Sequence, residues 1–179
     1  MGKSGLITSK VTHKDWAVNR RLPMNKTDSA NQLWFLDSLV TIRVSTSDSP
    51  DGISVLEHRM PHGSSPPFHL HRTEDELFHI LEGEYRVRVQ DQEHRVGPGT
   101  ILLAPKGVPH TYRVESAQGG RCLTITMRGD FERFVRAMSR PAERPELPKP
   151  AGLPSADAMQ ALRAIAAEYG IEFVGPPLQ

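Results

Sequence analysis

Short runs of alternating apolar and polar residues occupy the chain from about residue 33 to 127. Such period-2 alternation indicates β-strands with one buried face, because successive strand side chains point to opposite faces. Gly, Pro and Asp cluster between the runs, as turns require. The spacing therefore predicts one all-β sandwich or barrel over residues 33–128. The runs are LVTIRVST (39–46), GISVLEHRM (52–60), ELFHILEG (76–83), EYRVRVQ (84–90), TILLAP (100–105), HTYRV (110–114) and RCLTITM (121–127).

Helical spacing replaces this alternation after the last run. Asp130 can cap a helix whose apolar residues recur at i, i+3, i+4 and i+7. A second helix is expected from a Ser155 cap to a stop at Gly170, with an apolar stripe that docks on the barrel or on a partner subunit. The apolar residues are Phe131, Phe134, Val135 and Met138 in the first helix and Met159, Leu162, Ala166 and Tyr169 in the second.

The expected organisation has three parts. Residues 1–32 are polar and weakly patterned, and we interpret them as an N-terminal arm. Residues 33–128 form the barrel. Residues 129–179 form a C-terminal helical extension, which contains a stiff linker because residues 140–154 include five prolines.

Charge and cysteine content exclude several classes of function. The chain has 22 Lys and Arg against 21 Asp and Glu, a net charge of +1, so it lacks the field that attracts nucleic acid or acidic membranes. The single cysteine, Cys122, excludes internal disulfides and cysteine-rich zinc or iron–sulfur sites. Neither a signal peptide nor a membrane-spanning stretch is visible, so we expect a cytoplasmic protein.

Polar residues that can bind a metal gather around residues 69–76. His69 and His71 are one residue apart in a strand-like run, so both imidazoles lie on one face. A short reversal can bring Glu76 back beside them. Two imidazoles and a carboxylate are half of a first-row transition-metal site. His110, at the start of a later run, can supply the remaining ligand.

Two segments resemble the motifs of the cupin family. The first motif, G-x5-H-x-H-x4-E-x6-G, fits residues 63–83, and the second, G-x5-P-x-G-x2-H-x3-N, fits residues 99–114 with Val114 in place of the final Asn. Fifteen residues separate the motifs, a spacing typical of compact single-domain cupins. The matching residues are Gly63, His69, His71, Glu76, Gly83, Gly99, Pro105, Gly107 and His110.

This resemblance implies a fold and a metal centre. The fold is the cupin double-stranded β-helix, a jelly-roll barrel, here with an N-terminal arm and C-terminal helices. One divalent first-row metal (Fe, Ni, Mn, Zn or Cu) is implied in its mouth, held by His69, His71, Glu76 and His110. The whole pattern most resembles quercetin 2,3-dioxygenase-like single-domain cupins. That implies a small enol, flavonol or 1,3-diketone-type substrate, to which O2 is added, with Glu76 as both ligand and catalytic base.

Several neighbours are sorted by strand face. Phe78 and Ile80 share the face of Glu76, and Tyr112 shares that of His110, so with Val114 they are expected to line the substrate pocket. His79 lies on the opposite face of its strand, at the outer surface or a subunit interface. Glu74 and Asp75, in the corner before Glu76, are expected to be solvated charges.

The fold leaves other functions open. Barrels of this type also serve isomerases, lyases and non-catalytic binding or regulatory modules, so fold analogy does not choose the activity. A metal-containing small-molecule binding protein is the main alternative to an enzyme. Because an exposed sheet edge favours pairing with another copy, we expect a homodimer.

Overall fold

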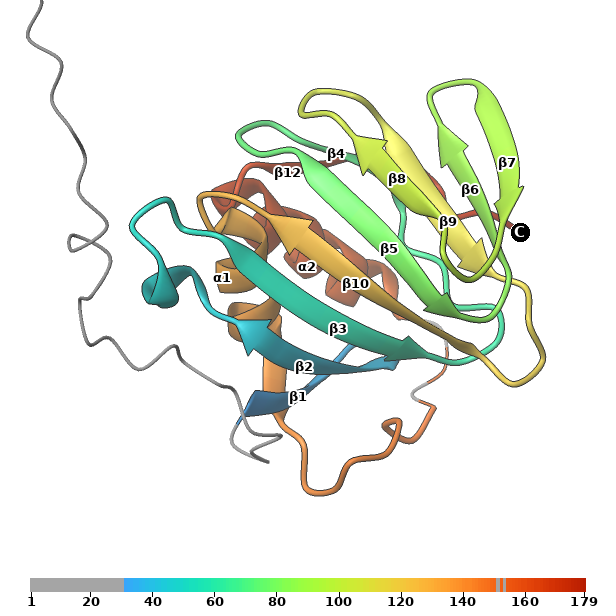
Figure 1. Cartoon of the computed structure of the whole chain (residues 1–179), viewed down its shortest axis with the longest axis horizontal. Helices are drawn as coiled ribbons and strands as arrows, with labels where there is room; N and C mark the ends of the chain where they lie inside the picture. Colours follow the sequence, from blue (N-terminus) through green and yellow to red (C-terminus); the bar gives the residue numbers. More distant parts are fainter. Residues whose placement is uncertain (1–30, 151, 153) are drawn as a thin grey trace, which may run out of the picture.

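Two antiparallel β-sheets and two α-helices make up the described part of the chain, residues 31–150, 152 and 154–179, in this computed structural model (Figure 1). The seven-stranded sheet has the order β11-β1-β2-β3-β10-β5-β8, and the five-stranded sheet has the order β12-β4-β9-β6-β7. The elements are β1 (Gln32–Phe35), β2 (Ser38–Val44), the 3₁₀ helix η2 (Thr46–Asp48), β3 (Ser54–Met60), β4 (Phe68–His71), β5 (Glu76–Glu82), β6 (Tyr85–Val89), β7 (Gln92–Val96), β8 (Ile101–Ala104), β9 (His110–Val114), β10 (Gly120–Thr126), α1 (Asp130–Met138), β11 (Ser139–Pro141), α2 (Ala156–Glu168) and β12 (Ile171–Gly175).

The predicted all-β fold is confirmed, and the alternation of the sequence explains its layers. In β5, Glu76, Phe78 and Ile80 are buried and the residues between them are half-buried, so one face of the strand is internal. In β4, His69 and His71 are buried while the alternate residues are half-buried. The two sheets enclose the internal faces, as in a jelly roll. Residues of the two motif segments, 63–83 and 99–114, thereby face the same interior.

Both predicted helices are present and pack on the barrel. In Figure 1, α1 and α2 lie behind β3 and β10, on the side of the seven-stranded sheet that faces the core. The predicted apolar stripes are internal, because they join one cluster with residues of β1, β2 and β3. The buried members of this cluster are Leu33, Phe35, Val40, Ile42, Leu56, Phe131, Phe134, Val135, Leu162, Ala166 and Ile171.

The ends of the helices correct one detail of the prediction. Ser155 caps α2 as expected, since its hydroxyl accepts a hydrogen bond from the amide of Ala158. Asp130 does not cap α1. The N-cap residue is Gly129, which has no side chain to accept a hydrogen bond, and Asp130 is the first helical residue. The Asp130 carboxylate accepts instead from the hydroxyl of Thr73 at 2.6 Å.

β7, β11 and β12 are among the strands that lie outside the alternating runs of the sequence. All but the last residue of β7 are exposed, so the strand shows no alternation. β11 and β12 are short and follow helices, yet they pair with β1 and β4 respectively. The C-terminal segment therefore adds an edge strand to each sheet. Of the predicted N-terminal arm, residues 1–30 lie outside the described residues, and Gln32 begins β1.

Of the helices in the described residues, none combines the length and the apolar character that crossing a bilayer requires.

Candidate metal centre

Three strands bring the four predicted ligands together inside the barrel. His69 and His71 come from β4, Glu76 is the first residue of β5 and His110 is the first residue of β9. β4 and β9 are neighbours, and His69 is paired directly with His110. All four side chains are buried, and one potential ligand atom from each lies within 4.8 Å of the others.

The Glu76 carboxylate lies between two of the imidazoles. Its Oε2 is 2.9 Å from Nε2 of His110 and 3.2 Å from Nε2 of His71. The ring of His69 lies 4.5 Å, centroid to centroid, from that of His110. The nitrogen and oxygen atoms thus converge on one small volume.

Backbone carbonyls fix the tautomers of two histidines. Nδ1 of His69 is 2.7 Å from the carbonyl oxygen of Pro67, and Nδ1 of His110 is 2.9 Å from that of Val108. A carbonyl can only accept, so in both rings Nδ1 carries the hydrogen and donates it. With the hydrogen on Nδ1, Nε2 of each ring faces the cluster and can offer a lone pair to a metal ion, which is the arrangement of metal-binding histidines.

The charges in the cluster depend on one another. Burial opposes ionisation of Glu76, but His71 and His110 outweigh it and hold the pKa of Glu76 well below its usual range. Burial also disfavours the charged form of His71, yet Glu76 and Glu74 together raise its pKa to about 9. Burial and the neighbouring His110 and His71 lower the pKa of His69 to about 3, so this ring is neutral at physiological pH.

This donor set fits a divalent first-row metal. A divalent ion among these buried donors would satisfy the carboxylate and the imidazole lone pairs, in place of the proton that His71 otherwise carries. Nδ1 and Nε2 of His71 are buried and have no hydrogen-bond partner among the described residues. Three imidazole nitrogens and one carboxylate suit Fe, Ni, Mn, Zn or Cu, and leave coordination positions open on an ion that accepts five or six ligands.

Two phenylalanines from the C-terminal part of the chain lie against the cluster. The ring of Phe131, in α1, is 5.6 Å from that of His71, and the ring of Phe173, in β12, is 6.4 Å from that of His69. These aromatic neighbours were missed from the sequence, because Phe131 lies 60 residues from His71 and Phe173 lies 104 residues from His69. They help to keep the ligand atoms away from water.

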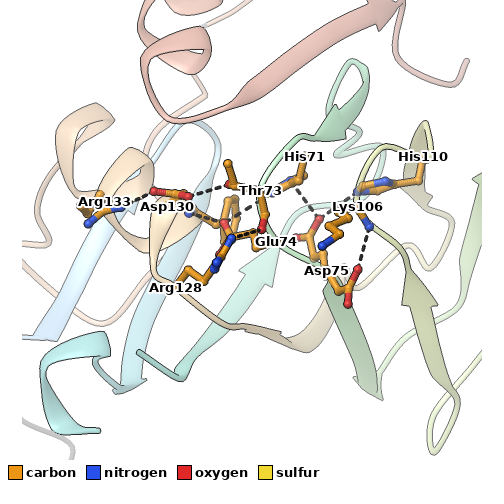
Figure 2. Close-up of polar contacts among 11 residues, drawn as sticks. His71, Thr73, Glu74, Asp75, Lys106, His110, Arg128, Asp130 and Arg133 are labelled. Atoms are coloured by element: carbon orange, nitrogen blue, oxygen red, sulfur yellow. Dashed lines mark hydrogen bonds and ion pairs between the residues drawn. The ribbon is translucent and has the colours of Figure 1, made fainter. Parts of the chain in front are cut away.

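Glu74 is a second residue that the sequence analysis placed wrongly. We expected a solvated charge, but Glu74 is 2% exposed. One of its oxygens accepts a hydrogen bond from the amide of Phe131 at 2.5 Å and is 3.6 Å from Nδ1 of His71 (Figure 2). α1 folds over the corner and buries the carboxylate. Asp75, by contrast, is exposed and accepts a hydrogen bond from the amide of Lys106.

The expected pocket residues lie near the cluster but are closely packed. Phe78, Ile80 and Tyr112 line a cavity of about 10 Å³, which is room for one water molecule. Val114 is fully buried in the core beside them, and the Tyr112 hydroxyl donates to the sulfur of Met60 at 3.1 Å. Catalysis on a larger molecule would therefore require these side chains to move.

Comparison with known proteins gives the family and a curated relative. Residues 56–126 match the model of the cupin domain family. Over 107 residues the chain is 28% identical to quercetin 2,3-dioxygenase of Bacillus subtilis (strain 168), which covers 60% of this chain. The chain spans about a third, 32%, of the length of that relative.

A solved structure shows the same fold. An RmlC-like cupin from Shewanella frigidimarina aligns with a TM-score of 0.50 and 16% identity, covering 59% of this chain and 93% of that one. A predicted oxalate decarboxylase from Thermotoga maritima aligns with a TM-score of 0.48 and 19% identity, covering 50% and 79%. The motif match and the family match agree, and residues 56–126 of this chain form a cupin domain.

Proposed function

We propose that the protein is a metal-dependent, dioxygenase-like enzyme that acts on a small enol, flavonol or 1,3-diketone-type substrate. The observation that carries this proposal is the buried cluster of three histidines and one glutamate, with the Glu76 carboxylate in its centre. The similarity to a quercetin 2,3-dioxygenase supports this choice of reaction.

Glu76 would act as the base in the proposed reaction. Held by the three histidines and Glu76, a divalent first-row ion would supply Lewis acidity toward an enol oxygen and access to redox chemistry with O2. The low pKa of Glu76 keeps its carboxylate ionised, so an Oε atom can accept the enol proton. The two backbone-anchored rings, His69 and His110, stay in place while this proton moves.

The surrounding side chains would bind and orient the substrate. Phe78 packs edge-on against both His110 and Tyr112, with centroid distances of 6.1 and 5.8 Å. A flat, mostly apolar substrate suits such aromatic walls. Burial of the ligands excludes bulk water from the reacting atoms.

Metal content is the first test. Protein purified without a histidine tag is incubated with Fe, Ni, Mn, Zn and Cu, and bound metal is measured by mass spectrometry. We expect about one ion per chain. In His110→Ala the affinity for metal should fall by more than about 100-fold, because loss of a ligand should cost more than loss of a residue that only supports a ligand. His79→Gln is the matched control. His79 is on β5, three residues beyond Glu76, but faces outward, so it should bind metal normally.

Oxygen uptake is the second test. Each metal-loaded form is mixed with flavonols, catechols and 1,3-diketones, and consumption of O2 is followed. We expect uptake with at least one class and its loss in Glu76→Gln. Absence of metal in every preparation would refute the proposed centre.

A non-catalytic small-molecule binding module is the second candidate, because the same metal cluster could hold a ligand without transforming it. No uptake with any class, together with a Glu76→Gln protein that binds a small molecule as well as the wild type does, would support that role instead.

A further inference from the structure

Glu74 is a buried carboxylate that the ligand set leaves unexplained. Its side chain is completely inaccessible, and it lies in the corner between β4 and β5. Oε1 accepts from the Phe131 amide, while Oε2 has no hydrogen-bond partner among the described residues. A buried carboxylate with an unused oxygen is costly, so its retention calls for a role beyond solvation.

His71 lacks the support that the other two histidines receive. Nδ1 of His69 and Nδ1 of His110 each donate to a backbone carbonyl, but Nδ1 of His71 has no hydrogen-bond partner in the described part of the chain. Oε1 of Glu74 is the carboxylate oxygen 3.6 Å from that nitrogen. A shift of roughly 0.7 Å would give an ordinary N–H···O hydrogen bond, whose length is about 2.9 Å.

α1 holds Glu74 in position. The N-cap of α1, Gly129, has no side chain for its amides, and the Glu74 carboxylate accepts from the second residue of the helix. Amides at a helix N-terminus stabilise a negative charge. The corner itself is tied to α1 by the Thr73–Asp130 hydrogen bond and to the turn before β9 by Asp75 and Lys106 (Figure 2).

We infer that Glu74 is a positioning residue for the metal centre. Its carboxylate accepts the Nδ1 hydrogen of His71, holds Nε2 of that ring toward the ion, and connects the site to the start of α1. Carboxylates that accept from a ligand histidine orient the ring and increase its basicity. This inference rests on the proposed metal site and adds a third support to it, the one that is linked to a helix.

Three variants test the role. Glu74→Gln keeps an oxygen acceptor for Phe131 and His71 but removes the charge. Glu74→Ala removes both acceptors. Asp75→Asn is the matched control, because Asp75 lies in the same corner yet contacts the amide of Lys106 and no histidine ligand. Zn²⁺ affinity is measured by competition with a chelator, and the melting temperature of the metal-free proteins is measured beside it.

We expect Glu74→Gln to weaken Zn²⁺ binding by about tenfold or more, Glu74→Ala to weaken it further, and Asp75→Asn to leave it unchanged. NMR of zinc-loaded protein labelled with ¹⁵N-histidine gives a readout that helix capping alone would not move. The Nδ1–H signal of His71 should shift in Glu74→Gln, while the signals of His69 and His110 stay in place.

Normal Zn²⁺ affinity and an unmoved His71 signal in Glu74→Gln would overturn the inference and reduce Glu74 to a helix cap, with the metal site intact. If wild-type protein binds no metal, the inference and the proposed function both fail. Should Glu74→Ala not fold, the near-isosteric Glu74→Gln still decides the question.

Discussion

Individual side chains in this barrel take their roles from the strand face they occupy and from the backbone next to them. His69, His71 and His110 all point inward, but they differ in what Nδ1 meets: a carbonyl for two of them and a carboxylate for the third. The strand position predicts that a histidine is internal. For His69 and His110 the partner of Nδ1 is the carbonyl two residues earlier in the chain, whereas the surroundings of Nδ1 of His71 depend on how α1 folds over the corner.

His58 is a buried histidine outside the ligand cluster. It is 4% exposed, its ring stacks on Phe131 at 6.0 Å, and its Nε2 has no partner among the described residues. Burial lowers its pKa to about 4, although the carboxylates of Glu76, Asp37 and Glu57 oppose this. The folded protein therefore keeps His58 neutral where the unfolded chain takes up a proton.

This difference predicts acid sensitivity. Between pH 6.5 and about 4 the unfolded state binds more protons at this position, so the free energy of unfolding falls as pH falls, by about 3 kcal/mol for His58 alone. Above pH 6.5 both states are neutral and this contribution is flat. In His58→Leu the dependence should be weaker but not absent, since His69 acts in the same direction. Urea unfolding gives the free energy of unfolding at pH 7.5 and at pH 4.5. If this free energy changes between the two pH values as much in His58→Leu as in the wild type, the assignment to His58 is contradicted.

The turn between β5 and β6 depends on a glycine. Gly83 joins β5 to β6 with φ of 84°, a left-handed conformation that favours glycine. A Cβ atom at this position would lie 2.6 Å from the carbonyl oxygen of Gly119. Glycine is therefore required at position 83 for two reasons, namely its backbone angle and the close approach of the backbone at Gly119.

Gly99 separates the effect of the left-handed backbone angle from the effect of the close approach. Its φ is 86°, but an added Cβ would meet nothing within 4 Å. Gly99→Ala should lower the free energy of unfolding by about 1 kcal/mol through backbone strain alone. Gly83→Ala should cost about 2–4 kcal/mol, because the clash adds to the strain. Chemical denaturation of the two variants checks this, and equal losses would show that the turn can move aside.

The whole molecule is larger than its motif region. The C-terminal helices share one hydrophobic cluster with β1, β2 and β3, and β12 extends the five-stranded sheet beside β4. Phe131 and Phe173 reach the histidines from this segment. Residues outside 56–126 thus contribute both to the hydrophobic core and to the surroundings of the candidate metal centre.

Association with a second copy stays a prediction. β8 is an edge strand, and on its outer face Ile101 is 61% exposed and Leu103 is 55% exposed. Such an apolar edge favours pairing with another chain. Light scattering should give twice the chain mass of 19.9 kDa, and Leu103→Glu should shift the protein toward the monomer. A monomeric mass for the wild type would refute the homodimer.

The sequence by itself determined the all-β fold, both helices and the convergence of His69, His71, Glu76 and His110, because alternation and motif spacing are local properties of the chain. It missed β7, which shows no alternation since it is almost wholly exposed. Only the tertiary structure decided that Glu74 is buried and that Phe131 and Phe173 contact the ligands. The burial of a polar corner residue depends on which distant helix covers it, and no local pattern records that.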